Sequence, residues 1–110
     1  MKSYTDIKQS KKLEEILPID SADMHWQYIE EDNGQLQWFC FPKDFSINQH
    51  DTVSAWSLVA LLNVLPSSTL DSSDDHHYKM HCMERFTEWF DNPIDACYEM
   101  ILKLKEKDLL

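Results

Sequence analysis

The side chains best suited to chemistry lie together between residues 74 and 82. This segment contains three histidines and a cysteine, which are ligand types that zinc prefers: His76, His77, His81 and Cys82. On a strand, His77 and His81 share one face while His76 and Cys82 point the other way. No C-x-x-C or H-E-x-x-H spacing completes a site. We therefore expect the acid-flanked start of an exposed strand here, with no metal and no cofactor bound.

The cysteines carry no pattern that indicates an activated nucleophile. Cys40 and Cys97 fall on apolar stripes, where a free cysteine usually packs as a small hydrophobe. Cys82 follows His81, but no third residue is evident that would orient the histidine. With one glycine, the chain also has no loop that could cradle a phosphate. We predict no catalytic residues and expect that the protein is not an enzyme.

Acidic residues dominate the middle of the chain. The whole sequence has 10 Lys+Arg and 20 Asp+Glu, for a formal charge of −10. Residues 13–102 contain 17 of the acids and only three basic residues: Lys43, Lys79 and Arg85. Such a segment repels DNA, so direct nucleic-acid binding is not expected. An acidic surface can serve solubility alone. It can also imitate DNA, and an inhibitor that occupies a nucleic-acid-binding site is our alternative hypothesis for function.

Length and composition predict one cytoplasmic domain over residues 1–110. The chain is 43% hydrophobic, so it can form a modest core. Its longest nearly uncharged stretch is interrupted by serines and a proline, and therefore predicts no membrane span. The first residues are charged and do not resemble a signal peptide. Three widely spaced cysteines, an odd number, are typical of reduced thiols in a cytosol.

Local patterns predict the first half of the fold. Apolar spacing predicts a helix over residues 5–17, which Pro18 ends. Residues 23–41 then alternate with a period of two around Asn33-Gly34, the dipeptide that most favours a tight hairpin turn. Thr52 or Ser54 is expected to cap a largely buried helix that runs to Leu65, before Pro66.

The second half of the chain is also predicted to contain both strands and a helix. Residues 67–75 are polar and are expected to form turns, and residues 78–83 and 86–90 are expected to form strands. Asn92 and Pro93 predict the start of a final amphipathic helix. The expected fold is α+β in the order α-β-β-α-β-β-α, with one small antiparallel sheet packed against helices.

Three of these segments, taken in order, carry a resemblance: residues 17–24, residues 56–66 and residues 91–100. Their helix stop, buried helix and N-capped helix resemble a group of small uncharacterised proteins from gut bacteria and their phage-like elements. The resemblance covers the chain from about Leu13 onward. It implies a small domain carried on mobile DNA, and it transfers no catalytic or binding residue.

Aromatic residues are the remaining candidates for function. In the segment 35–41, Leu36, Trp38 and Cys40 lie on one face, which we expect to pack on the core. Phe39 and Phe41 lie on the wetter face, beside an acidic turn. Aromatic residues are enriched at interface centres, so we predict a partner surface made of Phe39, Phe41, Glu30, Glu31 and Asp32. The expected function is a non-catalytic protein-interaction module of a mobile element, which binds an unidentified protein or a second copy of itself.

Overall fold

A computed structural model describes residues 2–45 and 52–110, which form an α+β fold as predicted. The described residues form three α-helices, one 3₁₀ helix and two three-stranded antiparallel sheets, in place of the single sheet expected. In chain order the elements are α1 (Ile7–Glu14), η1 (Ile19–Ser21), β1 (Met24–Glu30), β2 (Leu36–Pro42), β3 (Thr52–Ala55), α2 (Leu58–Val64), β4 (Ser68–Ser72), β5 (Tyr78–Cys82), β6 (Arg85–Phe86) and α3 (Pro93–Glu106).

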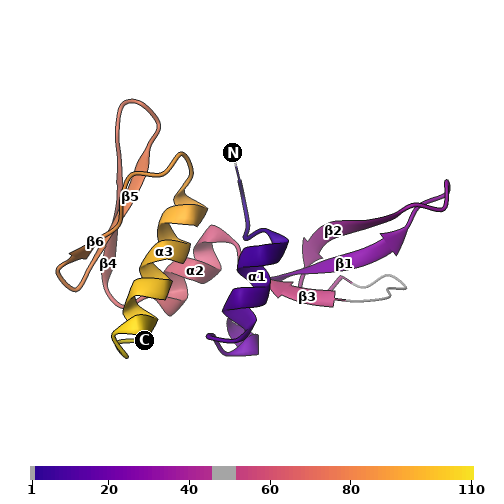
Figure 1. Ribbon diagram of the computed structural model, residues 1–110, viewed down its shortest axis with the longest axis horizontal. Helices are drawn as coiled ribbons and strands as arrows, with labels where there is room; N and C mark the ends of the chain where they lie inside the picture. Colours follow the sequence, from indigo (N-terminus) through magenta and orange to yellow (C-terminus); the bar gives the residue numbers. More distant parts are fainter. Residues whose placement is uncertain (1, 46–51) are drawn as a thin grey trace.

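The predicted hairpin is confirmed and forms most of the first sheet. Strands β1 and β2 pair in antiparallel register from Met24 opposite Pro42 to Glu30 opposite Leu36. Gly34 lies in the turn with φ of +84°, a conformation that glycine adopts without a steric penalty. We call β1, β2 and their turn, residues 24–42, the arm. Figure 1 shows the arm extending away from the helices, beyond α1.

The prediction that a helix begins at Thr52 or Ser54 is wrong. Residues Thr52–Ala55 form strand β3, which pairs with β1 on the side opposite to β2. The β-branched residues Thr52 and Val53 suit a strand. Helix α2 begins only at Leu58, where the Ser57 hydroxyl accepts the backbone N–H of Ala60 at 3.3 Å. The helix is also less covered than expected, because Val59 is 65% exposed.

The second sheet has the order β4-β5-β6 and corrects two further predictions. Residues 68–72, which were expected to form turns, are strand β4 and pair with β5 along its whole length. The strand expected over residues 86–90 is reduced to Arg85–Phe86, with an isolated bridge between Phe90 and Tyr78. The turn between β5 and β6 has Met83 and Glu84 at positive φ, as short hairpins require.

The two other predicted helices are confirmed. Helix α1 is shorter than expected; Asp6 caps it and accepts the N–H of Gln9 at 2.7 Å. Helix α3 begins at Pro93, and Asn92 Oδ1 accepts the N–H of Asp95 at 2.8 Å. None of the helices in the described part of the chain is long and apolar enough to cross a membrane.

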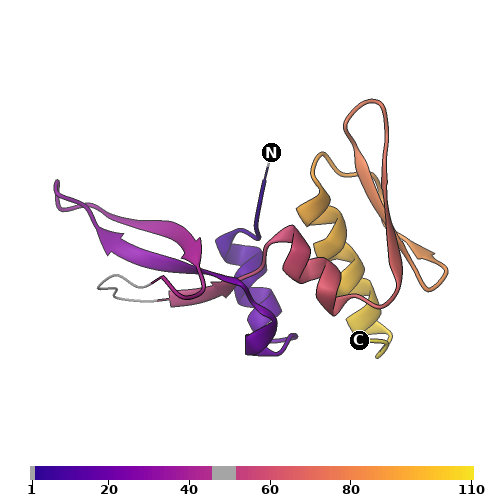
Figure 2. The same ribbon diagram turned by 180° about the vertical axis from the view of Figure 1, so that it is seen from behind.

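The core lies between the three helices and the second sheet. Figure 2 shows α2 and α3 side by side, with β4 and β5 beyond α3. Fully buried side chains from each layer meet there, among them Leu13, Trp56, Leu61, Met80 and Ile101. Among the described residues, none from the arm belongs to this cluster. The expectation that Trp38 packs on the core is therefore wrong.

Candidate protein-interaction surface

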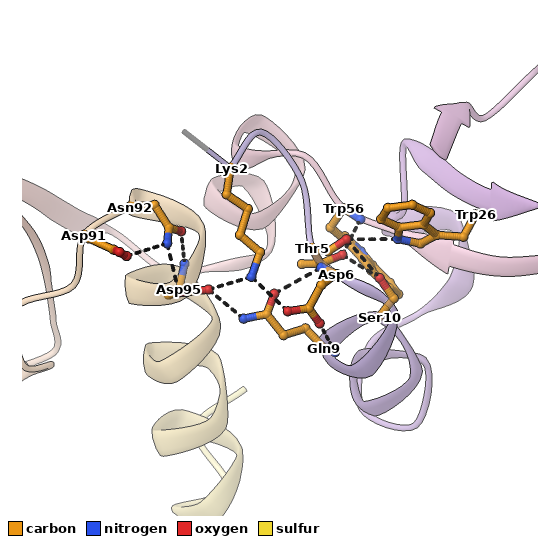
Figure 3. Close-up of polar contacts among 10 residues, drawn as sticks. All are labelled: Lys2, Thr5, Asp6, Gln9, Ser10, Trp26, Trp56, Asp91, Asn92 and Asp95. Carbon is orange, nitrogen blue, oxygen red and sulfur yellow. Dashed lines mark hydrogen bonds and ion pairs between the residues drawn. The ribbon is translucent and has the colours of Figure 1, made fainter. Parts of the chain in front are cut away.

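Buried polar contacts at Thr5 join the base of the arm to α1 and to the segment before α2. The N–H of Thr5 donates to Trp56 O at 2.9 Å, and the N–H of Trp56 donates to Thr5 Oγ1 at 3.1 Å. The indole N–H of Trp26, on β1, donates to Thr5 O at 3.0 Å (Figure 3). The Tyr4 ring meets the Trp26 ring edge-on, with centroids 5.4 Å apart. One face of the arm is thus covered at its base.

The opposite face of the arm is covered at its base by the segment that follows β2. Gln27 is 1% exposed, contacts His25 and donates a hydrogen bond from Nε2 to Phe45 O at 3.1 Å. The Phe45 ring stacks on Phe41, with centroids 4.7 Å apart. Phe45 itself remains 46% exposed. The base of the arm is therefore fixed on both faces, which positions its outer half.

The outer half of the arm carries apolar side chains that the core does not cover. Tyr28 and Trp38 face each other across the strands with ring centroids 4.9 Å apart, and both are half-buried. Leu36, the next residue along that face of β2, is 43% exposed. Phe39 lies on the other face and is half-buried. Both faces of the outer arm therefore offer apolar surface.

Acidic side chains lie at the end of the arm. Glu30 and Asp32 are exposed, while Glu31 is half-buried and its Oε2 accepts Gln37 Nε2 at 3.3 Å. The backbone of Glu31 also closes the hairpin, because its N–H donates to Gln35 O at 2.7 Å. The arm contains no lysine or arginine. Its end is therefore negatively charged at neutral pH.

The structure brings the predicted surface residues onto the arm but divides them between two faces. Phe39 and Phe41 share a face, whereas Glu30 lies opposite Leu36 on the other face. Phe41 is partly covered by Phe45. Leu36 and Trp38 were assigned to the core and are the residues that sequence reasoning missed. Hydrophobic alternation could not have found them, because β2 is apolar on both faces.

A second aromatic cluster lies on the outer face of the second sheet. The ammonium group of Lys79 lies 5.1 Å from the ring centroid of Phe86 and 4.9 Å from that of Trp89. The His81 ring stacks on Phe86 at 4.3 Å. Phe86 and Trp89 remain 54% and 48% exposed. Lys79 and His81 alternate along β5 with buried residues, and this alternation indicates a polar outer face. Strand β6, which adds Phe86 to this face, has only two residues and is too short to recognise in the sequence.

The histidines and the cysteine of residues 74–82 do not converge. His76 and His77 are exposed at the turn before β5, and His76 has a φ of 61°. His81 points to the outer face of the sheet, whereas Cys82 is 1% exposed and donates from Sγ to Ser67 O. In the described residues, no group of three or more His, Cys, Asp or Glu side chains is placed to hold a metal ion.

The thiols are placed where ionisation is unfavourable. Burial raises the pKa of Cys97 to about 12. Burial and the nearby Asp23 carboxylate raise the pKa of Cys40 to about 12, although Phe41 N–H lowers it slightly. Burial also raises the pKa of Cys82. Because the thiolate is the reactive form, these positions suit packing better than nucleophilic chemistry.

The chain matches no known protein family, no curated protein and no solved structure.

Proposed function

We propose that this protein is a non-catalytic protein-interaction module that binds its partner through the arm. One observation carries the proposal: the arm holds half-exposed aromatic residues on both faces while contributing nothing to the core that the described residues form. Side chains such as Trp38 and Phe39 therefore keep part of their apolar surface exposed after folding. Their burial against a partner removes this apolar surface from water.

The chemistry of the arm indicates the chemistry of the partner. Its aromatic rings favour apolar side chains, and its acidic end favours lysine or arginine. The arm has three acids and no basic residue, so complementary charge would bring a basic partner to it faster. The proposal places the protein in the cytoplasm, because its three cysteines are free thiols.

A pull-down from cells of the source organism tests this function. The bait is the wild-type protein, and the test variant is Trp38→Ala. The matched control is Phe86→Ala, which removes another half-exposed aromatic ring from the opposite sheet. Partners captured by the wild type should be retained by Phe86→Ala and weakened by Trp38→Ala by about tenfold or more, as expected for an interface anchor. Equal capture by both variants contradicts the proposal.

The alternative proposal is a DNA-mimic inhibitor, supported by the acid excess between residues 13 and 102. In that case the captured proteins bind DNA, added DNA duplex displaces them, and Trp38→Ala captures them unchanged. The place of the gene on a mobile element is part of the same proposal. A neighbouring nuclease or restriction gene favours the mimic, whereas neighbouring phage structural genes favour the interaction module.

A further inference from the structure

Strand β2 is an edge strand with its outer backbone groups in a regular row. Within the described residues, the first sheet ends at β2 on one side. The N–H of Glu31 donates to Gln35 O at 2.7 Å, and the N–H of Lys43 donates to Asp23 O at 3.0 Å. In an antiparallel ladder, hydrogen-bonded residue pairs alternate with pairs that are not hydrogen-bonded to each other. The β2 residues of the second kind of pair therefore point their N–H and C=O groups away from β1. These residues are Leu36, Trp38 and Cys40, followed by Pro42, which has no N–H.

The other edge of the same sheet, strand β3, is covered by helix α1. The N–H of Ser54, which points outward from β3, donates to the Glu14 carboxylate of α1 at 2.9 Å. Helix α1 packs along β3, so this edge is occupied within the chain. The sheet therefore has one edge that a helix covers and one edge at which no described strand or helix is paired.

The composition of β2 lacks the usual protection of an edge. Proteins commonly place lysine, an inward charge or proline on a long edge strand to prevent pairing with other chains. The seven residues of β2 contain no charged side chain, and its proline stands at the end. The edge strand β4 of the second sheet carries Asp71 and is shorter. An open and uncharged edge of this length is suited to accept another strand.

We propose that β2 binds an extended, basic segment of a partner protein as an added strand of the sheet. This inference rests on the proposed function, because it specifies how the arm holds its partner. The outward groups of Leu36, Trp38 and Cys40 bond to the backbone of the segment, and Trp38 and Phe39 contact its alternate side chains. Lysine or arginine at the end beside Glu30 and Asp32 complements their charge. A second copy is disfavoured, because each chain carries −10.

Substitutions at Leu36 separate the backbone contact from the side chain. Leu36→Pro removes the outward N–H and leaves the bonds between β1 and β2 in place, whereas Leu36→Ala removes only the side chain. The probe is a short fluorescein-labelled peptide of alternating lysine and valine, with a glutamate–valine peptide as the charge control. By fluorescence anisotropy, the lysine peptide should bind the wild type. Leu36→Pro should bind it about tenfold more weakly than Leu36→Ala, as for a lost hydrogen bond.

Amide hydrogen exchange on the wild type provides a second measurement that does not require the proline variant to fold. Saturating lysine–valine peptide should slow exchange at Leu36, Trp38 and Cys40. The amides of Gln37 and Phe39 already bond within the hairpin and should change less. Unchanged exchange at the outward amides overturns the proposal, as does failure of the lysine peptide to bind, or equal binding of the glutamate peptide.

The outcomes also distinguish this inference from the proposed function. If Leu36→Pro and Leu36→Ala bind equally while Trp38→Ala weakens binding, strand addition is wrong and the arm remains the binding surface. If Trp38→Ala also leaves binding of the cellular partner unchanged, the proposed function is wrong as well. A wild-type dimer in sedimentation that Leu36→Pro dissociates overturns the proposed occupant in favour of a second copy.

Discussion

Lys2 Nζ lies 2.9 Å from Asp95 Oδ1, although the two residues are 93 positions apart in the chain. The same ammonium group lies 2.9 Å from Asp6 Oδ2, in the N-cap of α1. Gln9 Nε2 also donates to Asp95 Oδ1, at 2.8 Å (Figure 3). Asp95 lies in the first turn of α3, where the helix dipole favours a negative charge. These contacts hold α1, and with it the base of the arm, against α3.

Replacing Asp95 with asparagine should therefore destabilise the fold. Asp95→Asn keeps the shape of the side chain but removes the charge that Lys2 contacts. Both side chains are about one quarter exposed, at 25% and 28%. We expect a loss of about 1–2 kcal/mol in the free energy of unfolding, measured by urea denaturation. Asp20→Asn, at an exposed position, is the control and should change stability by less than about 0.5 kcal/mol. Equal effects would show that the contact contributes nothing.

The same contacts predict a loss of stability in acid. Burial raises the pKa of Asp95, but hydrogen bonds from Lys2, Asn92 and Gln9 outweigh burial and hold the pKa below its usual value. The pKa of Asp6 is also lowered, because bonds from Gln9 and Lys2 outweigh its burial. A carboxyl whose pKa is lower in the folded state stabilises the fold above its unfolded pKa of about 4, and loses this effect as pH falls through the folded value. The stability difference between wild type and Asp95→Asn should therefore be largest near about pH 6 and shrink as pH falls below about 4. A constant difference over this range contradicts the assignment.

The tryptophans should separate the core from the arm. Trp56 is 0% exposed and its indole N–H donates to Ser21 Oγ at 2.9 Å, so Trp56→Ala should cost about 3–5 kcal/mol. The Trp38 ring contacts the Tyr28 ring and lies outside the core cluster. Trp38→Ala and Phe41→Ala should both fold, with losses of no more than about 2 kcal/mol because their sites are already partly solvated. Thermal melting followed by circular dichroism measures all three variants. Unfolding of Trp38→Ala at room temperature would place Trp38 in the cooperative core.

A substitution in the turn of the arm should act through backbone strain alone. Gly34 has φ of +84°, and a Cβ atom built there meets nothing within 4 Å. Gly34→Val should therefore destabilise by about 1–2 kcal/mol. Gly34→Asn should be milder, because asparagine tolerates this conformation. Urea unfolding of both variants tests the comparison, and equal stability of Gly34→Val and wild type would show that the turn does not need positive φ.

Elements with strong local signals could be predicted from the sequence. Asn33-Gly34 indicated where the hairpin turns, because Gly34 supplies the positive φ that ends the loop between Glu31 and Gln35. Asn92 and Pro93 defined the start of α3, because capping depends on residues that are adjacent in the chain. In both places the deciding interaction spans only a few residues.

Elements decided by distant partners could not be predicted. Residues 52–55 precede an apolar helix without a break, and only pairing with β1 makes them a strand. The polar segment 68–72 becomes β4 because β5 bonds to it. The exposed residues of the arm could not be predicted for the same reason. Trp38 and Phe41 lie on opposite apolar faces of β2, and their exposure depends on where the arm sits relative to the core.

The Glu14 carboxylate that accepts the N–H of Ser54 also limits how many edges of the first sheet can pair with other molecules. Fibrous aggregation through a sheet needs two open edges on each molecule, because one edge accepts a strand while the other offers the next site. In the described part of the chain, α1 packs along β3, whereas no strand or helix is paired with the outer edge of β2. Two molecules joined at β2 would form a sheet bounded by β3 at both ends, and further growth through this sheet would stop there. The apolar strand can thus remain available for recognition without giving the first sheet a route to continuous growth.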